Sequence, residues 1–494
     1  MLRLYDTRLR RKVDFTPREA GKVGVYVCGV TVYDYCHVGH GRTAVVFDVI
    51  VRHLRASGFD VRFVRNVTDV DDKIIRRAVA EGRSSAAVAH EFADAMTADY
   101  AALGVAPPDV APHATEHIDD MLRIIERLIA AGCAYAAGGD VYCAVGAMAG
   151  YGQLSGQSPD ELLAGARVEI GEHKRSPLDF ALWKGAKPDE PRWDSPWGPG
   201  RPGWHIECSG MAHRYLGETF DIHGGGSDLI FPHHENEIAQ SEGAFGRGSF
   251  ARHWLHSGMV SFGGEKMSKS LGNVVGIRKV AQTHDLESLR LLMMGVHYRS
   301  PMGFEIAKDE GGGGQTRFPD LDDAESRLEY FYRTLERLDA ELPGAGGAAV
   351  LPAAGRTAAR FKEAMDDDFN TAAALGHLYE SFQLANKLLD DPQSAPRDVR
   401  RATVAALARD LRQAGTTLGL FARAPGDFLL ARRGRVCARR GIDPAAVEAR
   451  IAERTSARAA KSFGRADEIR ARLRADGVEL MDGPTGTSWR VVVP

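Results

Sequence analysis

The pattern of apolar runs near the start of the chain predicts a strand, a helix and a second strand. Residues 23–34, VGVYVCGVTVYD, are rich in β-branched and aromatic side chains, and the next 20 or so residues, ending near Gly58, have helical spacing. A second apolar run, FDVRFVRNV, follows at residues 59–67. Because a strand–helix–strand unit pairs its strands in parallel, this opening predicts a nucleotide-binding, Rossmann-like α/β sheet.

The pattern of predicted elements changes twice further along the chain. Short strand-like pieces and Pro, Gly and Trp clusters such as KPDEPRWDSPWGPGRPG indicate an inserted subdomain, and the sheet pattern resumes at TFDIHGGGSD and HWLHSGMV. From about residue 320 the chain is rich in Ala, Leu, Glu and Arg at helical spacing, after a GGGGQ segment that is typical of a flexible joint. The predicted parts are residues 1–114 and 203–310 for the two halves of the catalytic domain, 115–202 for an inserted connective subdomain, 311–425 for a helical bundle and 426–494 for a small C-terminal module.

Length and composition limit the class of protein. A chain of 494 residues with 44% hydrophobic and 26% charged residues is typical of a globular protein with several domains. It has no run of about 20 apolar residues and no apolar stretch behind the basic start MLRLYDTRLRRKVDFTP, so we expect a cytoplasmic location. Six cysteines without tight, even spacing indicate reduced thiols or metal ligands rather than a disulfide framework.

The net charge of −3 conceals a basic tail. Residues 395–476 contain 19 Arg and Lys against 9 Asp and Glu, so this segment has a large positive excess while the rest of the chain is acidic. Such a tail suits a polyanionic partner such as nucleic acid. A solvated, Arg-rich helical face is the other interpretation, and charge alone does not decide between the two.

A histidine-rich turn follows the first predicted strand. His37, Val38, Gly39 and His40 stand at the expected start of a helix, where unpaired amides and the helix dipole attract phosphate. The glycine permits close approach of the backbone, and the imidazoles add hydrogen-bond donors. The alternative is that the two histidines only cap the helix.

A second segment fits the same chemistry. EKMSKSLG at residues 265–272 places Lys266 and Lys269 on a serine-bearing loop after an apolar strand. Lysines so placed would neutralise charge that develops on a pyrophosphate leaving group. Together with the histidine turn, this loop predicts nucleotidyl-transfer chemistry.

Thiols and imidazoles also suggest a metal site. His233 and Glu237 are four residues apart in HHENE and share one helical face, Cys28 ends the first strand, and Cys208 stands in WHIECSG. Sulfur, nitrogen and carboxylate ligands suit zinc, although the segment does not have the HExxH pattern of metalloproteases. The alternative is two small buried cysteines beside a polar helix face.

Taken together, these motifs resemble those of the class I aminoacyl-tRNA synthetases, whose HIGH and KMSKS signatures correspond to residues 37–40 and 266–270. Within that class the chain is most similar to the cysteinyl-tRNA synthetases, through landmarks that run from about residue 23 to 490. The landmarks are CGVTVYDYCHVGHGRT, NVTDVDDKI, SPLDFALWK, PGWHIECS, FDIHGGGSDLIFPHHENEIAQ, GEKMSKSLGN, HYRSP, MDDDFNTAAAL, ADEIRARL and GTSWR.

The resemblance implies an ATP-dependent ligase that forms cysteinyl-adenylate and transfers cysteine to the 3′ end of tRNA-Cys. It further implies one Zn²⁺ per chain and ATP used with Mg²⁺, and the basic tail would bind the tRNA with Trp489 and nearby arginines as stacking and phosphate contacts. We expect a monomer. The residues implied are Cys28, Cys208, His233 and Glu237 for zinc; His37, His40, Lys266 and Lys269 for catalysis; Gly39, His223, Gly225, Asp228 and Lys269 for the nucleotide; and Thr68, Trp204 and His205 near the amino acid.

A metal would answer a selectivity problem. Cysteine and serine differ only by sulfur for oxygen, and pocket shape alone separates near-isosteres by about a hundredfold. A thiol loses its proton on coordination to zinc, whereas the serine hydroxyl is far less acidic and a poorer zinc ligand. We therefore expect the substrate sulfur to complete the zinc coordination.

Two other functions fit parts of the sequence. The cysteine ligase of mycothiol synthesis resembles the catalytic half but uses an amino-sugar acceptor, and its relatives lack the full tRNA-binding tail. A catalytically silent RNA-binding paralogue is the second alternative, against which the complete signature loops and ligand types argue. One departure from the family pattern is the glycine-rich, longer segment between HYRSP and the helical bundle, at residues 311–314.

Overall fold

The computed structural model describes residues 1–158, 161, 173–262, 265–266, 274–308, 316–341, 349–483 and 486–492. The predicted glycine joint at 311–314 and Lys269 lie outside these residues. The chain forms two compact units, and each is described by itself. Unit 1 contains Met1–Ile277, Met293–Gly303 and Phe361–Leu375, and unit 2 contains Arg278–Leu292, Phe304–Arg360 and Gly376–Pro494.

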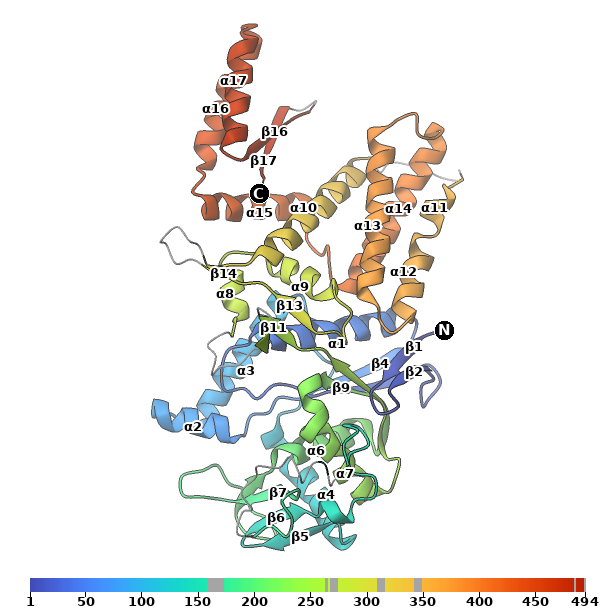
Figure 1. The fold of residues 1–494 in the computed structure, drawn as a ribbon, viewed down its shortest axis with the longest axis vertical. Coiled ribbons are helices and arrows are strands. Elements are labelled where there is room, and N and C mark those ends of the chain that lie inside the picture. Colours follow the sequence, from blue (N-terminus) through green and yellow to red (C-terminus); the bar gives the residue numbers. More distant parts are fainter. Residues whose placement is uncertain are drawn as a thin grey trace. The chain divides into compact units, whose positions relative to one another are not determined.

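Unit 1 is built on a four-stranded parallel sheet in the order β10-β9-β3-β4, with α1 between its first two strands in the sequence (Figure 1). The predicted strand–helix–strand opening and the Rossmann-like fold class are confirmed. Strand β3 buries Val25, Tyr26 and Val27 in succession, and β9 and β10 are buried over most of their length, as expected for a sheet covered on both faces. The elements are β3 (Lys22–Val27), α1 (Val38–Ala56), β4 (Asp60–Arg65), β9 (Thr219–Gly226) and β10 (Phe250–Ser257).

The order of the strands explains where a ligand site can form. The chain runs from β3 to β4 on one side, while β9 and β10 lie on the other side of β3. The N–H of Cys28 donates to the carbonyl of Gly224 at 3.1 Å, which joins β3 to β9 at this reversal. In open α/β sheets, ligands bind beyond the carboxyl ends of the strands at such a switch point.

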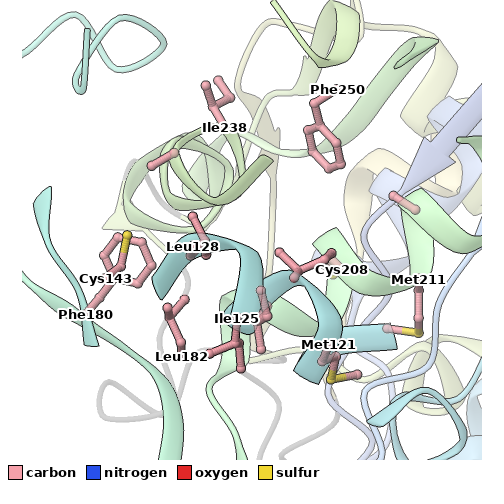
Figure 2. Packing of buried hydrophobic residues seen from close by; sticks show 14 of the residues in the cluster. Met121, Ile125, Leu128, Cys143, Phe180, Leu182, Cys208, Met211, Ile238 and Phe250 are labelled. Carbon is pink, nitrogen blue, oxygen red and sulfur yellow. The ribbon is translucent and has the colours of Figure 1, made fainter. Parts of the chain in front are cut away.

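The segment between β4 and β9 brings helices and a small antiparallel sheet to unit 1. Helices α4 and α6 pack together through buried apolar side chains, among them Met121 and Ile125 on α4 and Met211 on α6, and Cys208 lies in the same cluster (Figure 2). This packing fixes the helix that carries one predicted zinc ligand. The elements are α2 (Asp72–Glu81), α3 (Ser85–Ala102), α4 (Ile118–Ala130), β5 (Ala134–Ala137), β6 (Asp140–Cys143), β7 (Phe180–Gly185), β8 (Gly200–Pro202) and α6 (Trp204–Leu216).

One buried carboxylate forms hydrogen bonds with several segments of unit 1. Asp368 is fully buried and accepts hydrogen bonds from the N–H of Tyr5 at 2.8 Å, the hydroxyl of Tyr298 at 2.9 Å and Nε of Arg299 at 2.7 Å. Residues 361–375 therefore belong to unit 1, although the chain on both sides of them belongs to unit 2. The predicted domain boundaries stay a prediction.

Unit 2 is mainly helical within its described residues. Its long amphipathic helices bury aromatic and aliphatic residues against one another, as in the stacked pair Phe331 and Phe382 with ring centroids 4.5 Å apart. Helices α12 and α13 each have one end in unit 1. The helices after residue 315 are α10 (Pro319–Ala340), α11 (Pro352–Gly355), α12 (Thr357–Asp366), α13 (Thr371–Asp390), α14 (Arg397–Leu418), α15 (Pro425–Arg440), α16 (Pro444–Ala459) and α17 (Phe463–Ala475).

The chain ends in a hairpin that packs on α15, α16 and α17 through the buried cluster around Trp489. Trp489 is only 3% exposed, donates from Nε1 to Glu448 at 2.6 Å, and has the guanidinium of Arg433 over its ring at 4.6 Å. The sequence suggests that this tryptophan stacks on RNA; that interpretation is wrong, because the indole belongs to the core of the module. The hairpin strands are β16 (Val478–Gly483) and β17 (Gly486–Val491).

The remaining elements are short apart from α7 and α9. Among the described residues, no helix combines the length and the apolar character that crossing a bilayer requires. The remaining helices and strands are β1 (Arg3–Asp6), β2 (Arg11–Asp14), α7 (Glu235–Phe245), β11 (Val260–Phe262), β12 (Glu265–Lys266), α8 (Ile277–Ala281), α9 (Leu286–Met294), β13 (Met302–Phe304), β14 (Ala307–Lys308) and β15 (Thr316–Arg317), with short turns of helix at Ala114–Glu116, Val145–Ala147, Ser227–Leu229 and Ile230–His234.

Candidate active site

The predicted histidine turn stands at the start of α1. His37 is the N-cap residue, and its Nδ1 accepts a hydrogen bond from the N–H of His40 at 3.2 Å. The N–H of His37 in turn donates to Nδ1 of His40 at 3.5 Å, and the two rings stack with centroids 3.5 Å apart. Both histidines therefore cap α1. Capping also holds both imidazoles at the positive end of the helix dipole, where an anion is favoured.

A cavity of about 350 Å³ opens beside this turn, at the carboxyl ends of the parallel strands. It is large enough to hold a small ligand, and its walls come from β3, α1, β9 and β10 as the switch-point argument requires. Six predicted site residues line it: Cys28, His37, Gly39, His40, Trp204 and Asp228. Five further lining residues were not predicted: Thr31, Tyr33, Arg65, Lys73 and Tyr100.

Two residues expected at the nucleotide lie elsewhere. His223 is fully buried, and its Nε2 is 2.8 Å from Oε2 of Glu237, so its side chain belongs with the predicted zinc ligands. Gly225 is close-packed, since an added Cβ there would come within 2.9 Å of His234 and Leu229. Of the segment IHGGGSD, Gly226 and Asp228 line the cavity.

The four predicted zinc ligands come together from three parts of the chain. Cys28 follows β3 and Cys208 lies on α6, while His233 lies in the helical turn Ile230–His234 and Glu237 lies at the start of α7. Their donor atoms all lie within 4.8 Å of one another. The helical spacing of His233 and Glu237 predicts this pairing, and a distance of 3.0 Å from Nε2 to Oε1 confirms it.

The spacing of these donors fits zinc. The Sγ atom of Cys28 is 3.5 Å from Sγ of Cys208 and 3.4 Å from Oε1 of Glu237. Zn²⁺ with ligand bonds of about 2.0–2.3 Å in a tetrahedron separates its ligands by roughly 3.3–3.8 Å, so little movement would be needed. A second group that could hold a metal exchanges Cys208 and His233 for His223 and His234. The first set suits zinc better because it supplies two sulfurs.

Electrostatics in the cluster favour a cation. Burial opposes the charged form of Glu237, but His223 and His233 outweigh it and hold the pKa of Glu237 at about 2. Burial likewise disfavours protonated His233, yet Glu237 raises the pKa of His233 to about 10. Hydrogen bonds from Cys28 and His233 lower the pKa of Cys208 to about 6 against the effect of burial, whereas burial raises the pKa of Cys28. An anionic carboxylate and an acidified thiol are suited to a bound metal ion.

Further imidazoles surround these ligands. Nδ1 of His205 is 2.9 Å from Nδ1 of His233, which leaves Nε2 of His233 directed at Glu237. Nδ1 of His234 is 2.8 Å from Nε2 of His256, and burial lowers the pKa of both rings. His234 and His256 are absent from the predicted site, although HHENE and HWLH contain them. Their partners are set by tertiary packing, which sequence spacing does not reveal.

The residues expected near the amino acid also lie around the zinc ligands. The ring of Trp204 stacks on His233 with centroids 4.2 Å apart and is 37% exposed, so it forms part of the cavity wall. Thr68 is buried, and its Oγ1 accepts a hydrogen bond from Nδ2 of Asn66 at 3.1 Å. Lys266 stands on β12, which pairs with β11, and Lys269 falls outside the described residues.

The fold is that of the class I tRNA synthetases. Residues 14–309 match the family described as tRNA synthetases class I (C) catalytic domain, and residues 360–422 match the DALR domain. A solved methionyl-tRNA synthetase from Mycobacterium tuberculosis, in complex with methionyl-adenylate, has the same fold, with a TM-score of 0.58 and 18% identity over 83% of this chain and 93% of that one.

Curated relatives define the family more narrowly. The chain is 52% identical over 494 residues to the cysteine–tRNA ligase of Anaeromyxobacter sp. (strain Fw109-5), and 49% identical over 496 residues to that of Geobacter sulfurreducens. Each comparison covers 99% of both chains. The chain belongs to the cysteine–tRNA ligase family.

Proposed function

We propose that this chain activates L-cysteine with ATP as cysteinyl-adenylate and then transfers the cysteinyl group to the 3′ end of tRNA-Cys. One observation carries the proposal: Cys28, His37 and His40 line the same cavity, and Cys208, His233 and Glu237 surround the Cys28 thiol. A site for a sulfur-containing substrate thus adjoins a site for a triphosphate.

In the first step the carboxylate of cysteine attacks the α-phosphate of ATP, and pyrophosphate leaves. The two capping histidines, His37 and His40, and the amino end of α1 bind the triphosphate of ATP, which is used with Mg²⁺. Lys266 and Lys269 neutralise the charge that develops on the leaving group. Since no side chain acts as a nucleophile, these residues contribute by positioning and electrostatics.

Selection of cysteine rests on Cys28, Cys208, His233 and Glu237. These residues would hold Zn²⁺, which supplies a Lewis acid that accepts the substrate sulfur as thiolate and discriminates against the serine hydroxyl. His223 and His205 orient Glu237 and His233 through the contacts described above.

Other residues complete the pocket. Thr68, Trp204 and His205 lie near the amino acid, and of these Trp204 lines the cavity and is partly exposed. Gly39 and Asp228, which also line the cavity, bind the nucleotide. Gly225 supports this side by allowing close packing against His234.

In the second step a terminal ribose hydroxyl of the tRNA attacks the adenylate carbonyl. The positive excess of residues 395–476 and the DALR domain support binding of the tRNA by the helical part, with 311–425 and 426–494 gripping its stem and anticodon. We also propose that the enzyme is cytoplasmic and monomeric.

A charging assay tests the proposal and separates it from its alternatives. Purified protein, total tRNA, ATP and labelled cysteine should give cysteinyl-tRNA, because the whole chain resembles relatives that are named as tRNA ligases. Ligation of cysteine to an amino sugar in place of tRNA would favour the mycothiol-type ligase. Absence of cysteine-dependent pyrophosphate exchange would favour a silent RNA-binding protein.

Metal analysis tests the selectivity mechanism. We expect about one zinc per chain, and a cobalt-substituted sample should change its visible spectrum on addition of cysteine but not of serine. The reason is that only the substrate sulfur enters the metal coordination. Protein without bound metal, or an equal spectral response to the two amino acids, would contradict the mechanism.

A further inference from the structure

One side of the active-site cavity has no part in the first step of the proposed reaction. The zinc ligand Cys28 lies at the end of β3, the two capping histidines stand at the start of α1, and Asp228 follows β9. The sheet order places β4 on the other side of β3 from β9. Cavity residues near the end of β4, which we call the β4 side of the cavity, are Tyr33, Arg65, Lys73 and Tyr100. This side is available to another substrate.

Two cations on the β4 side lie over tyrosine rings. The ammonium of Lys73, on α2, is 5.4 Å from the ring centroid of Tyr33. The guanidinium of Arg65, the last residue of β4, is 4.8 Å from the ring centroid of Tyr100 on α3. An aromatic ring attracts a cation through its quadrupole but does not cancel the charge. Both side chains are therefore held beside the cavity as cations.

The guanidinium of Arg65 has no counter-ion in contact with it. Arg65 is only 9% exposed, and within the described parts of the chain its Nη1 has no hydrogen-bond partner. The charge of Asp48 acts on Arg65, but its carboxylate is bound by Nε of Arg52 at 2.8 Å and by the N–H of Ala106 at 2.9 Å. Because a buried charge is costly unless it is paired, an anionic ligand would be stabilised here.

Lys73 is exposed, and its neighbours do not neutralise it. Asp71 accepts a hydrogen bond from the backbone N–H of Lys73 at 2.7 Å, and the carboxylate of Asp72 lies 3.0 Å from the ammonium of Lys184. Among the residues that the structure describes, the ammonium of Lys73 forms no ion pair, unlike Arg77 on the same helix, which is paired with two carboxylates. The β4 side therefore presents two uncompensated positive charges.

The second step of the proposed reaction brings one more anion to the cavity. The terminal ribose hydroxyl of the tRNA has to reach the adenylate carbonyl, so the last nucleotide enters the same cavity. The triphosphate of ATP is assigned to His37 and His40, and the carboxylate of cysteine must meet the α-phosphate there. Lysine and arginine contacts to phosphate fix the position of a nucleic-acid backbone. A phosphodiester of the tRNA therefore suits the β4 side.

We propose that Lys73 and Arg65 form a phosphate subsite for the 3′-terminal nucleotide of the tRNA, which holds this nucleotide while its ribose hydroxyl attacks the adenylate. This role rests on the proposed function. Lys73 contacts the phosphate from the exposed surface, and Arg65 adds a second positive charge from below it. The ring of Tyr33 keeps the lysine at the cavity.

The test separates the two steps of the reaction. Enzyme that holds labelled cysteinyl-adenylate is mixed with tRNA, and single-turnover transfer should be about tenfold or more slower in Lys73→Gln and in Arg65→Gln, because a misplaced hydroxyl reacts poorly. Cysteine-dependent pyrophosphate exchange, which needs no tRNA, should stay within about threefold of the wild-type rate. Melting temperatures show whether Arg65→Gln folds, and Lys73→Gln tests the proposal through an exposed side chain.

Two results of this assay would overturn the proposal. The first is transfer at the wild-type rate by Lys73→Gln. The second is an equal fall of exchange and transfer in that variant, which would assign the lysine to cysteine or ATP instead of the tRNA.

A modified tRNA identifies the phosphate. In this tRNA a neutral methylphosphonate replaces the phosphodiester that joins the last two nucleotides. The wild-type protein should transfer cysteine to it about tenfold more slowly than to normal tRNA, whereas Lys73→Gln should lose less than about threefold, since its interaction with that phosphate is already absent. Equal losses in the two proteins would show that Lys73 does not act on this phosphate, and would contradict the proposal.

Lys22→Gln is the matched control. Lys22 is an exposed lysine at the first residue of β3, at the opposite end of this strand from the cavity. The variant should transfer cysteine and exchange pyrophosphate at wild-type rates. If the wild-type protein itself shows no cysteine-dependent exchange, the proposed function fails, and this differs from normal exchange with unaltered transfer in Lys73→Gln, which removes the subsite alone.

Discussion

Replacing Cys208 by serine should abolish zinc retention and lower cysteine-dependent pyrophosphate exchange by roughly a thousandfold. The side chain keeps its size, but a neutral hydroxyl is a poorer zinc ligand than a thiol whose pKa is already lowered to about 6 by Cys28 and His233. Loss of residues that only support a ligand costs about 10–100-fold in affinity or activity, and loss of a ligand should cost more. Zinc analysis and exchange assays on the same preparation measure both effects.

Cys133→Ser is the control for this experiment. Cys133 is a partly exposed thiol in the inserted segment and takes no part in the donor cluster, so the variant should keep its zinc and its exchange rate. A Cys208→Ser protein that retains stoichiometric zinc and wild-type exchange would remove Cys208 from the proposed metal site.

Replacing Lys269 by alanine should lower cysteine-dependent exchange by about 10²–10³-fold. The lysine ends the KMSK sequence that begins at Lys266, the last residue of β12, and we expect its ammonium to neutralise the negative charge that develops as pyrophosphate leaves. The KM for cysteine should change little, since the interaction strengthens only in the transition state.

Lys279→Ala is the corresponding control, because Lys279 is an exposed lysine on α8 and also close to this sequence. Its exchange rate should match that of the wild type. Normal exchange by the Lys269 variant, with an intact fold by circular dichroism, would exclude the lysine from the mechanism.

The sequence predicts the fold well where local patterns decide it. The opening strand–helix–strand unit, the cap formed by His37 and the one-turn spacing of His233 and Glu237 all depend on residues close together in the chain. The approach of Cys28 to Cys208 spans 180 positions, and only the resemblance to a known family predicts it.

Tertiary contacts explain why some site residues could not be predicted from the sequence and why one prediction was wrong. His234 and His256 have roles only through partners that packing brings to them, and no spacing rule points to those partners. Trp489 stands among arginines in the sequence and suggests a surface for RNA, yet the hairpin turns the indole into the core of the module. A buried or exposed aromatic ring cannot be distinguished from such a short context.

The position of Asp368 has a consequence for dividing the protein. A fragment that stops at residue 310, where the second half of the predicted catalytic domain ends, would keep Tyr298 and Arg299 but lose the buried acceptor that both of them use. A buried polar group without a hydrogen-bond partner lowers the free energy of unfolding, so such a fragment would be less stable than the same part of the whole chain. Any split or minimal version of this enzyme therefore has to include residues 361–375, even though they are encoded far downstream of the nucleotide-binding motifs.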